Sequence, residues 1–556
     1  MTLPDESTEA MKPLDKAILA SGSPRDSITH WVLLVLAAWC VWRPVETFPS
    51  TAVLVAFAVL GLAVWTWRRT PARSNRCLVA GAVGCVLWVS GMAGWDPASA
   101  VVEFALLAAV ATLIWMASRV LPPRRWPALL ALAISALALW GLWQVAWGMD
   151  QAASVIAELP DEMQAAAAER LASGRAFASQ LLPSHLAVLL ATALPLLLAQ
   201  LRPRRVALPW AVGSALCVVG LVLTRSPIGA ALALVACAAL ALRRRRGLLL
   251  WVVLLLIPVL VVVVVGRGDV VELEPVQLRL DNWRTAVWVW SKAPAAGVGI
   301  GGFAQAAQAV PFEVGNRPRH VHSLPLELLA ELGPVGLLTS VLAAFGLWRL
   351  LRRLWPEQPE LAVALAVVPA HNLVDFSLYG SGVALPWAVL LGWAMAIVRK
   401  TSEPESAPAR GRVVFVAAAT TALAMTILHV TSIAVEESAA ESPRPTERME
   451  GALQACRLAP WRIDPLGLVG AAALDTGNLD RIAVAMVELD HNRWLRPRSA
   501  ALASLRARLA LSVERAPTAV AEAWAASSEQ PSNENHSSNL RALLDQLDSG
   551  AKIVDP

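Results

Sequence analysis

Apolar residues occur in long blocks along the chain, separated by short segments that carry most of the charge. Each block has roughly the 16–22 residues that a helix needs to cross a hydrocarbon core of about 30 Å. The pattern therefore predicts an all-α polytopic membrane protein with about 13 transmembrane helices. The predicted helices cover residues 29–45, 51–67, 77–93, 98–116, 127–147, 181–201, 206–224, 227–242, 248–265, 326–348, 361–379, 383–398 and 413–433.

The composition agrees with this class, because 56% of the 556 residues are hydrophobic and only 16% are charged. The polar stretch 1–29 lacks the apolar core and cleavage site of a signal peptide, so we expect the first helix to direct insertion. Five of the six cysteines fall inside apolar blocks, and their spacing indicates neither a disulfide framework nor a zinc site.

Arginine clusters follow every second apolar block and indicate the orientation of the chain. They lie at residues 68–76, 119–125, 202–205, 243–246, 349–353 and 399–412. The positive-inside rule places these segments and residues 1–28 in the cytoplasm. Residues 148–180, the turn at 225–227 and the long loop 266–325 are then on the outer side. Topology accounts for the net charge of +5, and nucleic acid is not expected as a partner.

The chain is expected to end in a soluble helical domain on the outer side, residues 434–556, after a membrane domain at 29–433. Small and apolar residues recur at helical spacing across 460–497, with a break at 476–478, which is typical of tetratricopeptide-like hairpins. A polar linker at 527–538 precedes a last short helix, 540–547. Such a domain would bind a partner protein or a growing polymer, or would cover the outer loop.

Arginine is rare on the outer side, so the exceptions are candidates for chemistry. They are Arg225, Arg267, Arg279, Arg284, Arg317 and Arg319. A guanidinium offers a planar pair of donors that suits a phosphate, which predicts a site for a diphosphate of a lipid headgroup or a lipid-linked intermediate. The alternative is that these arginines pair with carboxylates of the same loop, such as Glu274 and Asp281.

Two histidines, His320 and His322, directly precede an apolar block and are expected at the outer mouth of a helix. A histidine in this place can act as a base near neutral pH, or it can simply anchor a helix end. Zinc is the weaker alternative, since no third ligand lies nearby.

Polar residues inside the predicted helices are Glu103, His185, His371 and Asp375. Ionisable groups at such depth are costly, so they usually mark a site or a pairing partner. His371 and Asp375 are four residues apart, so on a helix they would share one face and could pair with each other.

Five segments together resemble the O-antigen ligase and Wzy-type polymerase superfamily of membrane glycosyltransferases. They are GRAFASQLLPSHLAVLLATALP (174–195), LTRSPIGAALAL (223–234), RLDNWRTAVWVWSKAPAAGVGIGGF (279–303), HVHSLPLELLAELGPVG (320–336) and HNLVDF (371–376). The third segment is the most specific, since it matches the family's Arg-x-x-x-Trp and then Pro-x-x-Gly-x-Gly-x-x-Phe almost position for position. Ser184 and Ser323 replace the usual asparagines, and Pro227 stands where the family has arginine.

This resemblance implies transfer of a glycan from an undecaprenyl-diphosphate carrier to an acceptor hydroxyl on the periplasmic face of the bacterial inner membrane. It implies His322 as the general base, with inversion at the anomeric carbon and without metal or other cofactor. The diphosphate would be held by Arg279, Arg225 and Arg284. Supporting roles are expected for His320, Glu327, His185, His371 and Asp375.

The acceptor implied by the resemblance is a saccharide, lipid A core or a protein, and the tail is a candidate site for polysaccharide-assembly proteins. Two other classes remain as alternatives, a flippase for lipid-linked glycans and a non-catalytic assembly scaffold. A flippase would need polar residues distributed through the helix interiors, whereas this chain concentrates its polar residues at the outer face of the membrane.

Overall fold

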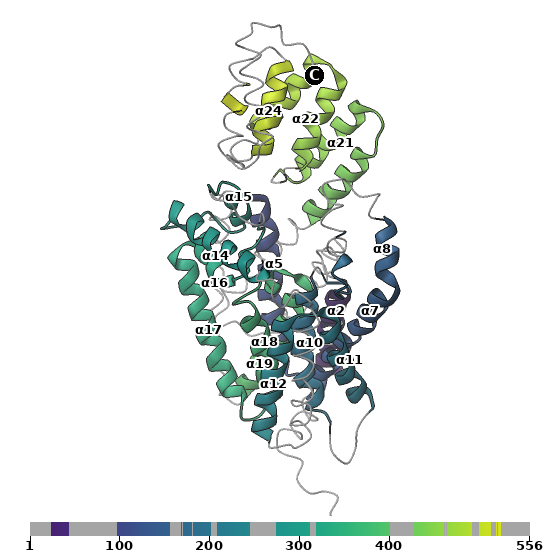
Figure 1. The fold of residues 1–556 in the computed structure, drawn as a ribbon, viewed down its shortest axis with the longest axis vertical. Coiled ribbons are helices and arrows are strands. Elements are labelled where there is room, and N and C mark those ends of the chain that lie inside the picture. Colours follow the sequence, from purple (N-terminus) through teal and green to yellow (C-terminus); the bar gives the residue numbers. More distant parts are fainter. Residues whose placement is uncertain are drawn as a thin grey trace, which may run out of the picture.

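The computed structural model of the chain is a helix bundle with a second group of helices at one end (Figure 1). It describes residues 24–43, 97–155, 168, 171–180, 182–201, 208–244, 274–311, 318–400, 427–460, 462, 464–491, 500–512, 519 and 521–523. Every regular element within these ranges is helical, which confirms the all-α prediction for this part of the chain.

Three apolar helical stretches are long enough to cross a membrane: Trp126–Gly148, Pro334–Leu354 and Ser381–Arg399. The first consists of α6 (Trp126–Ser135), α7 (Leu137–Trp143) and the π-helix η2 (Gln144–Gly148), and the others are α17 (Pro334–Leu354) and α19 (Ser381–Lys400). Shorter apolar helices are α2 (Pro24–Trp42), α5 (Pro97–Ala117), α10 (Pro183–Leu198), α11 (Leu208–Thr224), α12 (Pro227–Arg244) and α18 (Pro359–His371). The chain is therefore a helical membrane protein.

Most predicted helices that fall in the described ranges are confirmed, with small shifts at their ends. The blocks 51–67, 77–93 and 248–265, and most of 413–433, lie outside the described residues. The total of about 13 helices and the orientation of the chain therefore stay predictions.

Two predicted helices are wrong in their extent. The block 326–348 is interrupted, because α16 (Leu324–Leu332) ends at Gly333, whose φ of 64° no helix can continue, and α17 begins at the following proline. The block 361–379 is also too long, because α18 ends at His371 and is followed by a turn and the 3₁₀-helix η4 (Ser377–Tyr379).

The long loop predicted at 266–325 is largely helical where it is described. It contains α14 (Glu274–Lys292) and the short α15 (Phe303–Ala307). In α14, apolar and aromatic residues alternate with charged ones at helical spacing, so one face packs on α16 while the other stays exposed. The helix that carries Arg279 and Arg284 is thus held by packing.

Helix α10 lies at the centre of the bundle, and nearly all of its residues are buried. It is apolar on all sides, which is typical of a helix with neighbours all round, and it packs against α6, α11, α12 and α18. Its first turn carries His185, so the core of the fold directly supports this end of the bundle.

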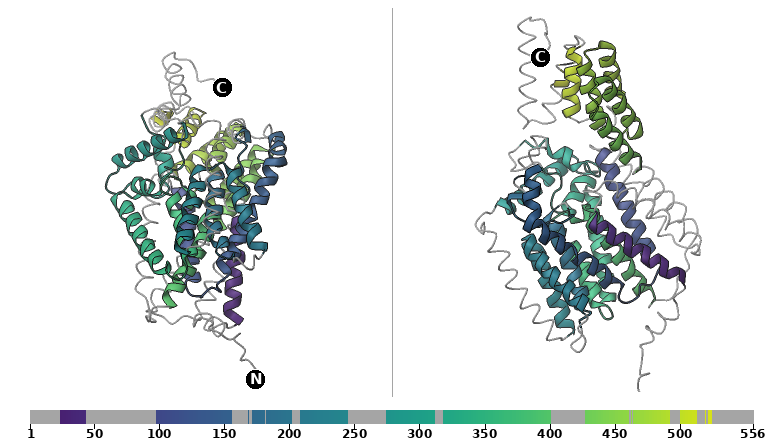
Figure 2. Two further views of the ribbon diagram at one scale, coloured as in Figure 1. Left: turned by 60° about the horizontal axis from the view of Figure 1, so that its bottom comes forward. Right: turned by 90° about the vertical axis from the view of Figure 1, so that its right-hand side faces the viewer.

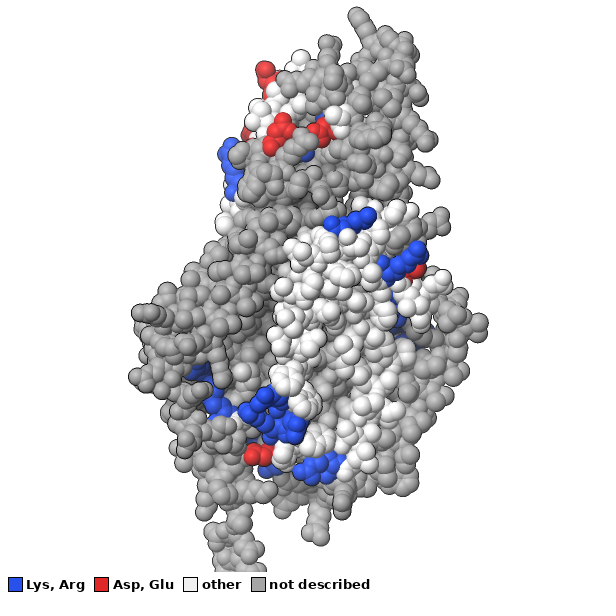
Figure 3. Space-filling view, turned by 90° about the vertical axis from the view of Figure 1, so that its left-hand side faces the viewer, with Lys and Arg blue, Asp and Glu red and all other residues white. Residues whose placement is uncertain are grey.

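Helix α17 behaves differently, since most of its apolar side chains are exposed, among them Leu338, Val341, Leu342 and Phe345. On the side of the molecule that carries α17, Figure 3 shows a broad surface without charged side chains, with basic groups gathered at its two ends. An apolar exposed surface of this kind suits contact with lipid.

The second group of helices comprises α21 (Pro445–Leu458), α22 (Asp464–Thr476), α23 (Leu479–His491) and α24 (Ala500–Ser512), which share a core of their own. They stand beyond the end of the bundle that carries α14, α15 and α16, as the right-hand view of Figure 2 also shows. The predicted break is confirmed: Gly477 has a φ of 59°, and the Asn478 side chain caps α23 by accepting the backbone N–H groups of Asp480 and Arg481. The linker at 527–538 and the helix at 540–547 lie outside the described residues.

The glycine-rich segment after α14 packs closely against the end of α16. The backbone N–H groups of Val298 and Gly299 donate to the carbonyls of Ala330 and Glu331 at 3.1 and 2.9 Å, which fastens the segment to the end of α16. Gly297 has a φ of 69°, and a Cβ there would lie 2.2 Å from the Glu331 carbonyl carbon. Only glycine permits this close approach.

We therefore expect Gly297→Ala to destabilise the protein by about 2–4 kcal/mol, through backbone strain and a clash that neither segment can avoid. Gly346→Ala on α17 is the matched control, because nothing lies within 4 Å of a Cβ at that position. Thermal unfolding of both purified variants in detergent measures the difference. Equal melting temperatures for the two would show that the segment does not depend on this contact.

Candidate active site

Several helix ends meet at the end of the bundle below the tail. Four of the chain's eight histidines gather there, His185, His320, His322 and His371. Three of their rings contact Phe376, with ring centroids 4.6 Å from His320, 4.6 Å from His322 and 5.3 Å from His185. Residues far apart in the sequence thus form one polar cluster around an aromatic ring.

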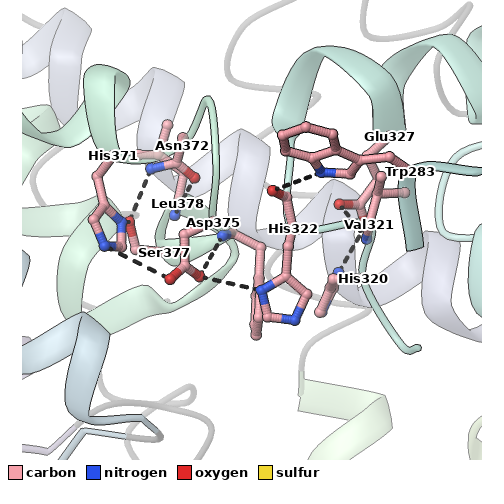
Figure 4. Close-up of polar contacts among 11 residues, drawn as sticks. Trp283, His320, Val321, His322, Glu327, His371, Asn372, Asp375, Ser377 and Leu378 are labelled. Atoms are coloured by element: carbon pink, nitrogen blue, oxygen red, sulfur yellow. Dashed lines mark hydrogen bonds and ion pairs between the residues drawn. The ribbon is translucent and has the colours of Figure 1, made fainter. Parts of the chain in front are cut away.

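His322 has an unusual backbone conformation, with a φ of 59°. A non-glycine residue in the left-handed region costs about 1–3 kcal/mol and is held there by its surroundings, here by the Trp283 indole N–H, which donates to the His322 carbonyl at 3.4 Å. The result directs the imidazole Nδ1 toward Asp375 Oδ1, 3.7 Å away (Figure 4). The His322 side chain keeps 27% of its surface exposed, so a solute can reach it.

Asp375 lies between two imidazoles. Its Oδ1 accepts the backbone N–H of Phe376 at 2.7 Å, and its Oδ2 lies 3.6 Å from His371 Nε2. The predicted pairing of His371 with Asp375 is confirmed, but not on a helix face: α18 ends at His371, and a turn brings the carboxylate back. This turn lets Asp375 contact His322 as well.

His320 is held in a second, separate pair. Its Nδ1 lies 2.7 Å from Glu327 Oε1 on α16, and Glu327 Oε2 accepts the Val321 backbone N–H. The ring stacks on Phe376 and lies 4.6 Å from the ring of Tyr379, the single tyrosine of the chain. His320 is therefore fixed by packing and by a buried carboxyl group, and its side chain is 15% exposed, compared with 27% for His322.

The surroundings keep both histidines neutral. Burial lowers the pKa of His322 from its ordinary value of 6.5 to about 4; the Asp375 carboxylate opposes the shift, and the Arg279 charge adds to it. Burial, with the charge of Arg319, lowers the pKa of His320 to about 3. At neutral pH the imidazole of His322 thus has a free lone pair and can accept a proton.

The three arginines expected at a diphosphate occupy different places. Arg279 is half-buried on α14, and its charge acts on both His322 and His371. Arg284 is exposed and lies about 140° around the same helix from Arg279, since five residues advance a helix by more than one turn. The two cannot face the same point from α14.

Arg225 lies in the turn between α11 and α12, with a φ of 46° and its Nη1 3.3 Å from the Ser173 carbonyl. The neighbouring Arg175 donates from Nε to the Thr224 carbonyl at 3.0 Å. Among the described contacts, none joins Arg225 to His322. A second arginine, Arg175 of the segment before α10, thus contacts this turn. Sequence reasoning missed it, because its Gly-Arg dipeptide lay inside a motif compared for its Gly and Phe.

Sequence reasoning also missed four residues that hold the cluster: Asn372, Phe376, Ser377 and Trp283. Phe376 and Trp283 belong to motifs compared with the family, which was the available signal. Nothing in the sequence distinguishes Asn372 and Ser377 from other small polar residues. No three His, Cys, Asp or Glu side chains in the described ranges are arranged to hold a metal ion.

Residues 210–341 match the family model described as O-antigen ligase. The matched region contains His320, His322, Arg225, Arg279 and Glu327, whereas His371 and Asp375 follow it in the sequence. No curated protein matches the chain. The family match ends before the tail and gives the tetratricopeptide interpretation no support.

We expect Glu327→Leu to destabilise the protein by about 1–3 kcal/mol for each of the two buried groups, His320 Nδ1 and the Val321 N–H, that lose their hydrogen-bond partner. Glu327→Gln is the matched control, since it keeps one oxygen acceptor and the same shape. Melting temperatures in detergent should fall in the order wild type, Gln, Leu. A Leu variant as stable as wild type would mean that this pair does not hold His320.

Proposed function

The chain carries an O-antigen ligase domain, an enzyme domain of a family that acts on lipid-linked glycans, and from this premise we propose a specific reaction. It is the transfer of a glycan from undecaprenyl diphosphate to an acceptor hydroxyl on the periplasmic face of the inner membrane. The observation that carries the proposal is the neutral, solute-accessible imidazole of His322, backed by Asp375 and close to Arg279.

His322 acts as the general base. Its Nε2 takes the proton of the acceptor hydroxyl, whose oxygen forms a bond to the anomeric carbon on the face opposite the leaving group. The bond from that carbon to the diphosphate oxygen breaks, and its electron pair stays on the diphosphate. One displacement of this kind inverts the configuration at the anomeric carbon.

Arg279 stabilises the charge that develops on the diphosphate. A guanidinium already in place needs no reorganisation as the bond breaks, and it binds phosphate oxygens bidentately. Arg175, from the segment before α10, donates to the α11–α12 turn that carries Arg225, and these two arginines bind the donor at a second point. Arg284, on another face of α14, contributes less. No step in this reaction calls for a metal ion.

The distribution of polar groups supports transfer over translocation. The cluster around Asp375 lies at the ends of α18 and α10 and in the segments that follow α14 and precede α16. In the described part of the bundle, basic residues occur in the last turns of α12 and α17, and Figure 1 shows these two helix ends at the end of the bundle opposite to α14 and α16. These residues are Arg243, Arg352 and Arg353. With these groups in the cytoplasm, the cluster and the tail are periplasmic, where carrier-linked glycans are used. The tail presents a helical surface to a partner or to the polymer.

We expect His322→Ala to reduce glycan transfer by about 10²–10⁴-fold, because the acceptor hydroxyl loses its base. Cells carrying the variant should accumulate carrier-linked glycan, which mass spectrometry of extracted lipids detects. Immunoblotting must show wild-type protein levels. A flippase or a scaffold would keep working, so full glycan output from this variant contradicts the proposed mechanism.

Arg279→Ala should weaken binding of undecaprenyl diphosphate by about tenfold or more, corresponding to at least about 1.4 kcal/mol. Arg284→Ala on the same helix is the matched control and should stay within about twofold of wild type. Titration of purified protein in detergent with undecaprenyl diphosphate gives both dissociation constants. The reverse order would move the diphosphate site to the other face of α14.

The rate should stay high in mild acid. Because a base works in its deprotonated form, and burial lowers the pKa of His322 to about 4, kcat/KM should be constant from pH 8 to about pH 5 and fall below that. Initial rates of undecaprenyl diphosphate release, with lipid-linked glycan extracted from a deletion strain as donor, give the profile. Circular dichroism must show intact protein at each pH, and an acidic limb near 6.5 would contradict the buried base.

A further inference from the structure

Buried polar side chains beyond those that the proposed reaction requires are connected to His322 through Asp375. We propose that Asn372, Ser377 and His371 are positioning residues that determine, through Asp375, which nitrogen of His322 carries the proton. This inference rests on the proposed role of His322 as the base.

The orientation of the Asn372 amide is unambiguous. Its Oδ1 lies 3.0 Å from the backbone nitrogen of Leu378, which can only donate, and its Nδ2 lies 2.9 Å from the Val368 carbonyl oxygen, which can only accept. The same Nδ2 lies 2.8 Å from Ser377 Oγ. Asn372 therefore donates to the serine hydroxyl, and Ser377 keeps its own proton for another partner.

That partner is His371. Ser377 Oγ lies 3.1 Å from His371 Nδ1, so the hydroxyl donates to a ring nitrogen that bears a lone pair. A neutral imidazole has one proton, which must then be on Nε2. His371 is fully buried, and its Nε2 faces Asp375 Oδ2 at 3.6 Å. The other tautomer would direct a lone pair at a carboxylate.

Asp375 connects His371 to His322, the proposed base. Its Oδ1 already accepts the Phe376 backbone N–H and faces His322 Nδ1 at 3.7 Å. A carboxylate accepts and does not donate, so the proton of His322 belongs on Nδ1. The lone pair is then on Nε2, the nitrogen that must take the hydroxyl proton. The same logic orients the histidine of a Ser-His-Asp triad.

The two contacts of Asp375 are longer than hydrogen bonds. His322 Nδ1 and His371 Nε2 are buried, and among the described residues they have no hydrogen-bond partner. Each lies about 0.7 Å beyond an ordinary N–H···O distance from the carboxylate, and such contacts in unliganded sites tighten when substrate binds. Because both nitrogens are buried and directed at one carboxylate, we expect both to hydrogen-bond to Asp375 when substrate is bound.

The polar and charged groups around His322, Asp375 and His371 come from several packed helices. The charge of Arg279 on α14 acts on His322 and His371. His185 of α10 and His320 contact the Phe376 ring, and Glu327 of α16 holds His320. Asp375 is the group whose carboxylate lies between the rings of His322 and His371. Among the described contacts, Asp375 is the acceptor that meets His322 Nδ1, so the residues that hold its carboxylate in place position this contact.

Two pairs of variants test the inference, with kcat and KM determined from undecaprenyl diphosphate release and donor extracted from a deletion strain. Ser377→Ala should lower kcat by about tenfold and leave KM within about twofold, because substrate binding is untouched. Ser135→Ala is the matched control, since it removes an equally buried hydroxyl that donates to the Leu132 carbonyl in α6. Both variants should lose similar stability, but only Ser377→Ala should lose kcat.

The second pair of variants, His371→Gln and His371→Asn, tests which nitrogen of His371 carries the proton. Gln places its amide nitrogen near the position of Nε2, whereas Asn places it near Nδ1. His371→Gln should therefore keep a donor to Asp375 and exceed His371→Asn in kcat by about tenfold. An Asn variant that equals or exceeds the Gln variant, or a Ser377→Ala variant with full kcat, would overturn the inference. If His322→Ala itself keeps full activity, the proposed function fails instead, so the two failures are distinguishable.

Discussion

The site is organised by one buried carboxylate. Asp375 lies just beyond the end of α18 and is almost fully buried, where an uncompensated charge would cost several kcal/mol. The backbone N–H of Phe376 and the imidazoles of His322 and His371 surround it from three directions. The helix must end at His371 for this to occur, since a continued helix would direct Asp375 along the same face and away from His322. The termination of α18 is thus as important for function as the carboxylate itself.

The remaining scaffold holds the partners of Asp375 in place. The glycine-rich segment after α14 fastens that helix to α16, and α16 in turn holds His320 through Glu327. Trp283 of α14 donates to the backbone of His322 and supports its left-handed conformation. Arg225 is likewise a non-glycine residue with positive φ, and the described part of the chain has one other, Ala178. Strained backbone therefore coincides with two residues proposed to act on substrate, as expected where function outweighs local stability.

Much of the architecture could be predicted from the sequence, because blocks of apolar residues have one stable form in a membrane. Helices such as α10 and α19 follow directly from such blocks. The breaks could not be predicted in this way: Gly333 and the turn after His371 interrupt runs whose hydropathy continues. His322 and Asp375 attracted attention as ionisable groups in an apolar context, but Asn372 and Ser377 did not. Their importance comes from hydrogen-bond geometry, which hydropathy and residue spacing do not report. Arg225 stood out by its charge, but its contact with the Ser173 carbonyl depends on how the segment before α10 packs on the α11–α12 turn.

The stereochemistry of transfer tests the central claim most directly. If His322, oriented by Asp375, deprotonates the acceptor hydroxyl for one direct displacement, the new glycosidic bond must have the anomeric configuration opposite to that of the donor. Proton NMR of the donor lipid-linked glycan and of the transferred product gives both configurations from the anomeric coupling constants. Inversion agrees with a single base-assisted displacement. Retention would contradict it, because a single displacement from the face opposite the leaving group cannot retain the configuration, and His322 would then have a different role.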